Sequence, residues 1–197
     1  MLNRFLNRFR HDHSLLGRLA HRLRRDERGV SAIEFVLIFP LLVGLLAGTV
    51  DFGQALMVSR KMDQIVGTLG DMVSQQSSWT TTDLDAIMTG TAVIIQPFDN
   101  TNLQIQLAVL DVASDLTTKV NWARAYHTTA LTKGAASPVT IPTSIAESGV
   151  QLIAVKATYS LTTPFSSLLK PITGVTSYSY SKTYIMRPRI KDTITLG

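Results

Sequence analysis

One uninterrupted apolar run dominates this sequence: the 21 residues 30–50 contain a single ionisable side chain, Glu34. As a helix that rises about 1.5 Å per residue, the run covers roughly 31 Å, close to the thickness of the hydrocarbon core of a bilayer. We therefore expect residues 30–50 to form a transmembrane helix.

Positive charge is concentrated before this run. Residues 1–29 carry eight arginines against three acidic side chains, a surplus that equals the formal charge of +5 of the whole chain. By the positive-inside rule, this basic leader stays in the cytoplasm and residues 51–197 are exported. Because the exported part is neutral, it lacks the basic face that a nucleic-acid-binding domain needs.

A secretory signal peptide is an alternative, because it also joins a basic start to an apolar run. Its apolar core normally has about 7–15 residues, carries no glutamate and ends at a small-x-small cleavage site. Ala47-Gly48-Thr49 matches such a site poorly. The sequence therefore favours a retained span over cleavage at the C-terminal side of the run.

Glu34 stands five residues after Gly29, where the basic leader gives way to the apolar run. This arrangement resembles the class III signal of type IV prepilins and pseudopilins, in which a membrane peptidase cuts after the glycine. Cleavage between Gly29 and Val30 would create a new N-terminal ammonium. A carboxylate about one turn along a neighbouring helix can neutralise that ammonium and lower the cost of burying both charges. The alternative is an interfacial Glu34 that is hydrated among the lipid headgroups.

Three further residues of the run bear on helix association. Pro40 is tolerated because neighbouring membrane helices can satisfy the carbonyl that it frees, and a local kink is expected there. Gly44 and Gly48 form a small-xxx-small pattern that lets another helix approach closely. Together with Glu34, these residues form the predicted subunit-association surface.

The exported part combines helical and strand periodicity. Apolar residues at three- and four-residue spacing continue the first helix to about residue 76, and Thr82–Asp85 offers a capped start for a second helix over 83–95. Alternating patterns predict four strands, near 103–109, 119–126, 150–161 and 176–186. We expect an α+β, pilin-like fold in which a roughly four-stranded antiparallel sheet packs on the long N-terminal helix.

Finer expectations concern the strands and their connections. Alternate residues from Ile153 to Leu161 are expected to share one face of the third strand. Val120 and Trp122 are expected to point inward, residues 127–149 to form a loop, and residues 164–171 to form a crossover or a short helix. Tyr178, Tyr180 and Tyr184 are expected on one side of the last strand, where they either pack on the domain or offer a platform for a carbohydrate or a partner.

The whole chain resembles the TadE family of pseudopilin-like proteins from Tad (tight adherence, or Flp) pilus machines. The resemblance is carried by Arg28–Phe35, Pro40–Leu42, Asp51–Gly53, Val120–Ala125, Val150–Val155, Tyr159, Pro164, Phe165 and Tyr184–Arg189. It implies a minor pilin or assembly component of a bacterial inner membrane, with its folded domain in the periplasm. The implied partners are pilins, other pilus-assembly proteins and a prepilin peptidase.

No catalytic motif stands out, since the sequence contains no HExxH, GxSxG or Walker A pattern and no cysteine. The acidic residues are assigned to helix capping (Asp83, Asp85) or to turns (Asp99, Asp111, Asp115), and His127 to the surface. We expect no enzyme, cofactor, metal or small-molecule substrate. The alternative function is a permanently anchored periplasmic binding or sensory domain that keeps its leader and never enters a fibre.

Overall fold

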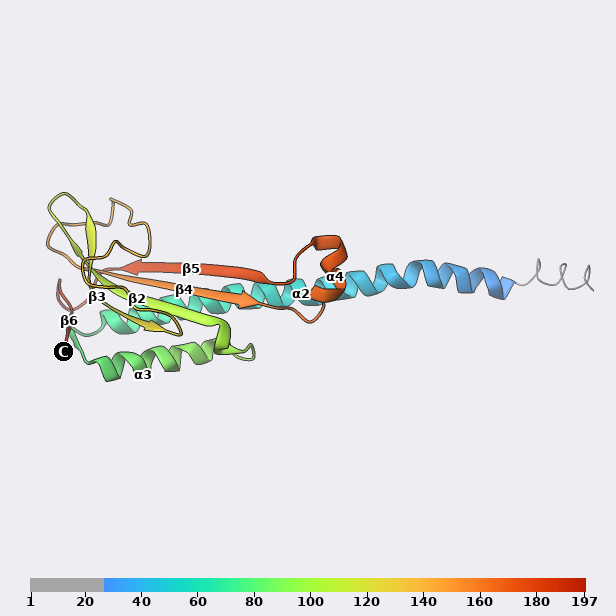
Figure 1. The fold of residues 1–197 in the computed structure, drawn as a ribbon, viewed down its shortest axis with the longest axis horizontal. Helices are drawn as coiled ribbons and strands as arrows, with labels where there is room; N and C mark the ends of the chain where they lie inside the picture. Colours follow the sequence, from blue (N-terminus) through green and yellow to red (C-terminus); the bar gives the residue numbers. More distant parts are fainter. Residues whose placement is uncertain (1–26) are drawn as a thin grey trace, which may run out of the picture. The chain divides into compact units, whose positions relative to one another are not determined.

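The computed structural model describes residues 27–197. Residues 1–26 of the predicted leader therefore lie outside the described residues. The first described element is the helix α2 (Glu27–Ser74), which contains the predicted span and ends close to the expected residue 76. The chain divides into two compact units, Met1–Ala47 and Gly48–Gly197. The long apolar helix and the four-stranded antiparallel sheet confirm the predicted α+β fold class (Figure 1).

The second helix begins earlier than predicted. α3 (Thr81–Ala92) is capped by Thr80, whose Oγ1 accepts a hydrogen bond from the Asp83 amide at 3.1 Å and donates one to the Asp83 carboxylate at 2.7 Å. A 3-10 turn, η1 (Val93–Ile95), then carries the chain to the predicted end. The predicted cap at Thr82 is wrong, because Thr80 has the extended backbone that a cap needs and stands three residues before Asp83.

The four-stranded sheet has the order β3-β2-β4-β5, and each neighbouring pair is antiparallel (Figure 1). Its strands are β2 (Leu103–Val112), β3 (Thr118–Tyr126), β4 (Leu152–Leu161) and β5 (Tyr178–Met186). A tight turn joins β2 to β3, whereas the connection from β4 to β5 contains the helix α4 (Ser166–Thr173). The short helix predicted within residues 164–171 is thus confirmed, but it contains Pro171 and runs two residues past it.

The main core lies between one face of this sheet and the helices α2 and α3. The strands contribute alternate residues, and the face predicted for β4 is confirmed from Ile153 to Leu161. The helices contribute residues at three- and four-residue spacing, as amphipathic helices do. The buried helical residues are Val58, Met62, Ile65, Val66, Leu69, Val73, Leu84, Met88 and Ala92.

A β-bulge in β3 changes one predicted orientation. Val109 pairs with Trp122 but Leu110 pairs with Val120, so Asn121 is an extra residue in β3. Because the extra residue reverses the alternation, Trp122 faces the main core while Val120 faces the other side of the sheet. The inward orientation is therefore confirmed for Trp122 and wrong for Val120.

Val120 belongs to a second, smaller core on the outer face of the sheet. Here Ala108, Leu110, Leu152 and Ala154 are fully buried. The predicted loop 127–149 covers them with the apolar side chains of Leu131, Ala135, Val139, Ile141 and Ala146. This covering explains why β2 is buried on both faces from Leu107 to Leu110.

The C-terminal segment closes one end of the domain. β6 (Thr195–Leu196) pairs in parallel with β1 (Ser78–Trp79), a pairing that the sequence does not predict. Trp122 Nε1 donates to the Ile194 carbonyl at 2.9 Å, and the Ile194 amide donates to Gln151 Oε1 at 2.6 Å. These bonds satisfy polar groups that would otherwise be buried without partners.

Candidate functional site

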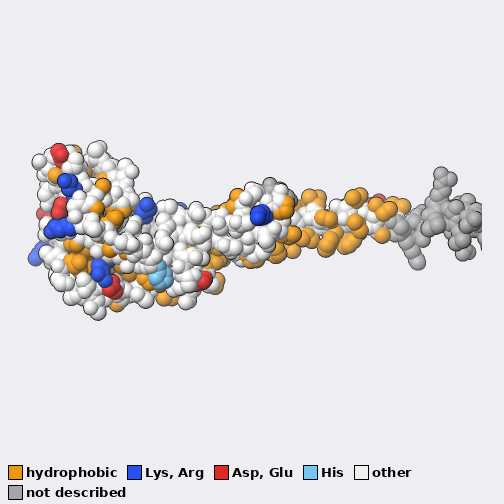
Figure 2. Space-filling model, in the orientation of Figure 1, with side chains coloured by type: hydrophobic (Ala, Val, Ile, Leu, Met, Phe, Trp, Pro, Cys, Tyr) orange, Lys and Arg blue, Asp and Glu red, His pale blue; other side chains and the backbone are white. Residues whose placement is uncertain are grey.

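Apolar side chains cover α2 in the first unit. The large side chains there are exposed, Leu37 by 72%. Figure 2 shows hydrophobic atoms along this part of the helix. By length and composition, α2 is the one helix within residues 27–197 that could cross a membrane. Because soluble surfaces rarely expose a continuous apolar patch of this size, the helix suits a lipid environment or the apolar faces of other helices.

The predicted processing site lies at the start of this helix. Gly29 and Val30 are both in the first turn of α2, and Glu34 follows Val30 by one helical turn. The Glu34 side chain is exposed, and across the described part of the chain it has no hydrogen bond or ion pair. Its carboxylate is therefore available to a cation from outside the chain.

The predicted association residues share one side of an ideal helix. At 100° per residue, Glu34, Pro40, Gly44 and Gly48 fall within an arc of about 120°. A Cβ atom built on Gly44 or Gly48 would meet no atom within 4 Å, so the fold itself does not require glycine at either position. α2 continues as one helix through Pro40.

Asp51 has a structural role that the sequence does not predict. Its side chain is 4% exposed, Oδ2 accepts a hydrogen bond from Thr163 Oγ1 at 2.6 Å, and Oδ1 accepts one from the Phe165 amide at 3.3 Å. A buried carboxylate needs such donors. These bonds join α2 to the segment between β4 and α4, and Asp51 belongs to the motif that resembles the TadE family.

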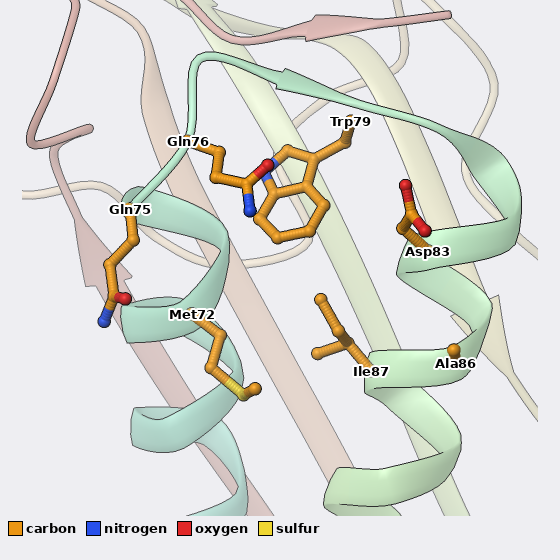
Figure 3. Close-up of a pocket in the computed structure, with 7 residues that line it drawn as sticks. All are labelled: Met72, Gln75, Gln76, Trp79, Asp83, Ala86 and Ile87. Carbon is orange, nitrogen blue, oxygen red and sulfur yellow. The ribbon is translucent and has the colours of Figure 1, made fainter.

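An open groove of about 460 Å³ lies between the end of α2 and α3. Figure 3 shows Met72 of α2 and Ile87 of α3 pointing toward each other across it, with Trp79 of β1 beside them. An adjoining hollow of about 470 Å³ shares Met72, Ala86 and Ile87 and is mostly apolar. The one carboxylate in this lining, Asp83, is engaged in the cap of α3.

Two of the aspartates have roles that differ from the predictions. Asp85 does not cap α3 but receives hydrogen bonds from Arg124 of β3, with Nη2 2.6 Å from Oδ1. Asp111 lies in β2 and not in a turn, and it accepts bonds from Asn121 and Gln151, each at 2.7 Å. Arg124 lies 39 residues from Asp85, and Gln151 lies 40 residues from Asp111. Spacing along the sequence therefore does not predict these contacts.

Asp115 occupies the turn between β2 and β3 as predicted, and Asp99 caps the 3-10 turn η2 (Asn100–Asn102). The Thr101 amide and hydroxyl donate to Asp99 and lower the pKa of its carboxyl group. Hydrogen bonds from the Thr117 hydroxyl and amide likewise lower the pKa of Asp115. Both carboxylates therefore act as local acceptors.

The remaining candidates are His127 and the tyrosines of β5. His127 is exposed, as predicted, and stacks on Tyr126 with ring centroids 3.9 Å apart. Tyr178, Tyr180 and Tyr184 share the inward side of β5, and burial raises the pKa of Tyr180. Within residues 27–197, no group of three or more His, Asp or Glu side chains is placed to hold a metal ion.

Comparison with known proteins gives a match to a family model. No curated protein and no solved structure is significantly similar to this chain. Residues 29–67 match the family model described as TadE-like protein. The matched segment begins at Gly29 and contains Glu34, Pro40, Gly44, Gly48 and Asp51. The resemblance to the TadE-like family predicted from the sequence is thereby confirmed over residues 29–67.

Proposed function

We propose that this protein is a non-enzymatic, membrane-anchored pseudopilin or minor pilin that takes part in the assembly of a Tad (Flp) pilus. The observation that carries the proposal is the TadE-like match, which spans Gly29, Glu34 and the exposed apolar surface of α2. We propose that α2 anchors the protein in a bacterial inner membrane. The basic leader supports a cytoplasmic N-terminus, with the α+β domain in the periplasm.

In the proposed mechanism, a prepilin peptidase cuts after Gly29 and leaves an ammonium on Val30. Glu34 of one subunit then pairs with the ammonium of a neighbouring pilin. Because four helical residues rise about 6 Å, the pair forms when the two helices are offset by roughly that distance along their axes. Mutual neutralisation lowers the cost of removing both charges from water.

Mass spectrometry of the native N-terminus tests the processing step. A chain that begins at Val30 supports the pseudopilin route. A chain that begins at Met1 contradicts it and favours the permanently anchored domain. Coexpression with an inactive prepilin peptidase supplies the control, because the Val30 terminus must then disappear.

Co-purification with pilus components tests the role of Glu34. We expect Glu34→Gln, as well as Glu34→Ala, to insert into the membrane normally but to lose its pilus partners. Asp192→Asn is the matched control, since it removes one exposed carboxylate of the C-terminal segment.

A double exchange, Ile33→Glu with Glu34→Ile, keeps the composition of the helix but moves the carboxylate by about 100° around it. It should insert and yet fail to co-purify. Normal recovery of the partners with this exchange would show that the position of the carboxylate on the helix does not matter.

A further inference from the structure

We propose that the domain has a second membrane-contacting surface, formed by α4 with its following turn and by the outward side of α2 at residues 52–57. Its apolar members, Phe52, Leu56, Met57, Leu168 and Val175, are here called the apolar collar. The occupant that we assign to it is the boundary between headgroups and acyl chains of an anionic phospholipid bilayer.

The first observation is that exposed apolar side chains on α2 continue past the predicted span. Phe52 is 66% exposed, Leu56 45% and Met57 47%, whereas Val58 is fully buried in the core. Gln54 is half-buried, and the first exposed polar side chain of α2 after Phe52 is Arg60. Seven residues beyond Val50 add about 10 Å of helix, which is comparable to the depth of the interfacial region of a bilayer.

The second observation is that α4 is held beside this part of α2. The two hydrogen bonds that Asp51 accepts from Thr163 and Phe165 fix the segment that leads into α4. Figure 1 shows α4 next to α2. Asp51 directly follows the predicted span. The segment that leads into α4 is therefore hydrogen-bonded to the first helical turn of α2 beyond the expected hydrocarbon core.

The third observation is the composition of α4 and the turn after it. Leu168 is 53% exposed and Val175 38%, and Lys170 is exposed between them in the sequence. Lys170 is the one charged residue of α4, and its residues include no acid. A short helix with exposed apolar side chains and a single cation suits an anionic lipid surface, where the lysine extends to the headgroups while its stem stays on apolar surface.

Single-cysteine labelling tests this surface in the full-length protein, because the chain contains no cysteine. An environment-sensitive NBD label is placed at Leu168→Cys or Val175→Cys, and Thr143→Cys in the loop over the outer sheet face is the matched exposed control. The protein is reconstituted at one copy per nanodisc of phosphatidylethanolamine and phosphatidylglycerol, so that no neighbouring subunit is present.

We expect the emission at positions 168 and 175 to shift to shorter wavelength and to be quenched by lipids that carry a spin label near the headgroup. The control at position 143 should show neither effect, and Lys170→Glu should reduce the quenching at 168. Spectra at 168 and 175 like that of the control would overturn the proposal. So would quenching that requires two copies per disc, because another subunit would then cover the collar. Since no pilus component is present, the result is independent of the proposed function.

Discussion

Gly70 offers a direct test of how closely α2 packs on the sheet. A Cβ atom built on Gly70 would lie 2.9 Å from Cδ1 of Tyr184 and 3.3 Å from Sδ of Met186, both on β5. At Gly67, in the same helix, a Cβ atom would meet nothing within 4 Å. Substitution of each glycine by alanine therefore makes the same chemical change in two different surroundings.

The expected free energies follow from two opposing effects. Alanine stabilises a helix interior by about 1 kcal/mol relative to glycine, and nothing opposes this gain at Gly67. At Gly70, the clash forces Tyr184 and the neighbouring backbone to shift, at a cost of about 1–3 kcal/mol. Gly67→Ala should stabilise the domain, while Gly70→Ala should be neutral or destabilising by up to roughly 2 kcal/mol.

Unfolding can be followed by the fluorescence of Trp79 and Trp122, which are both buried in the main core. For a domain of this size, 1 kcal/mol corresponds to a change in melting temperature of about 2–4 °C. Adding Tyr184→Val to Gly70→Ala should recover much of the loss, because it removes the ring that the new methyl group meets. Equal stabilisation by Gly67→Ala and Gly70→Ala would refute the close approach of α2 to β5.

Other features of the domain give three further predictions. Thr80→Ala should destabilise the domain by about 1 kcal/mol because it removes the cap of α3, whereas Thr82→Ala should change stability little; urea denaturation compares the two. Asp85→Asn should cost at most about 1 kcal/mol, since its ion pair is largely exposed, and the loss should shrink at high salt. The pKa of Asp115 is lowered, so its contribution is complete above the unfolded value of 3.8 and disappears as the pH falls through the lower folded value. Asp115→Asn should therefore flatten the stability–pH curve in acid titrations below that value.

The elements that could be predicted are those with a local signal. The apolar run and its amphipathic continuation predict α2, and strict alternation predicts the buried face of β4 from Ile153 to Leu161. In the candidate site, Gly29 and Glu34 could be predicted because they lie five residues apart, within one local sequence motif. Their arrangement around the helix follows from the period of 3.6 residues alone.

The features that escaped prediction depend on contacts between remote segments. Thr163 lies 112 residues after its partner Asp51, and no spacing rule connects the two. The bulge at Asn121 is visible only in the pairing of β3 with β2, and alternation alone therefore predicts the wrong face for Val120. The parallel pair of β1 and β6 consists of two residues from each strand, too few to give a periodic pattern.

The two parts of α2 bury their apolar side chains in different ways. Folding of the domain and assembly with other molecules therefore depend on different residues of this helix. In the second unit, one side of the helix is already covered by the sheet and α3. In the first unit, eleven large apolar side chains are exposed, and covering them is worth on the order of 10–20 kcal/mol. That is as large as the whole stability of a typical domain, so lipid or neighbouring helices must cover them. Substitutions at Gly70 or Thr80 should consequently change the melting temperature without changing insertion, while a change at Glu34 should affect association and leave the melting temperature unchanged.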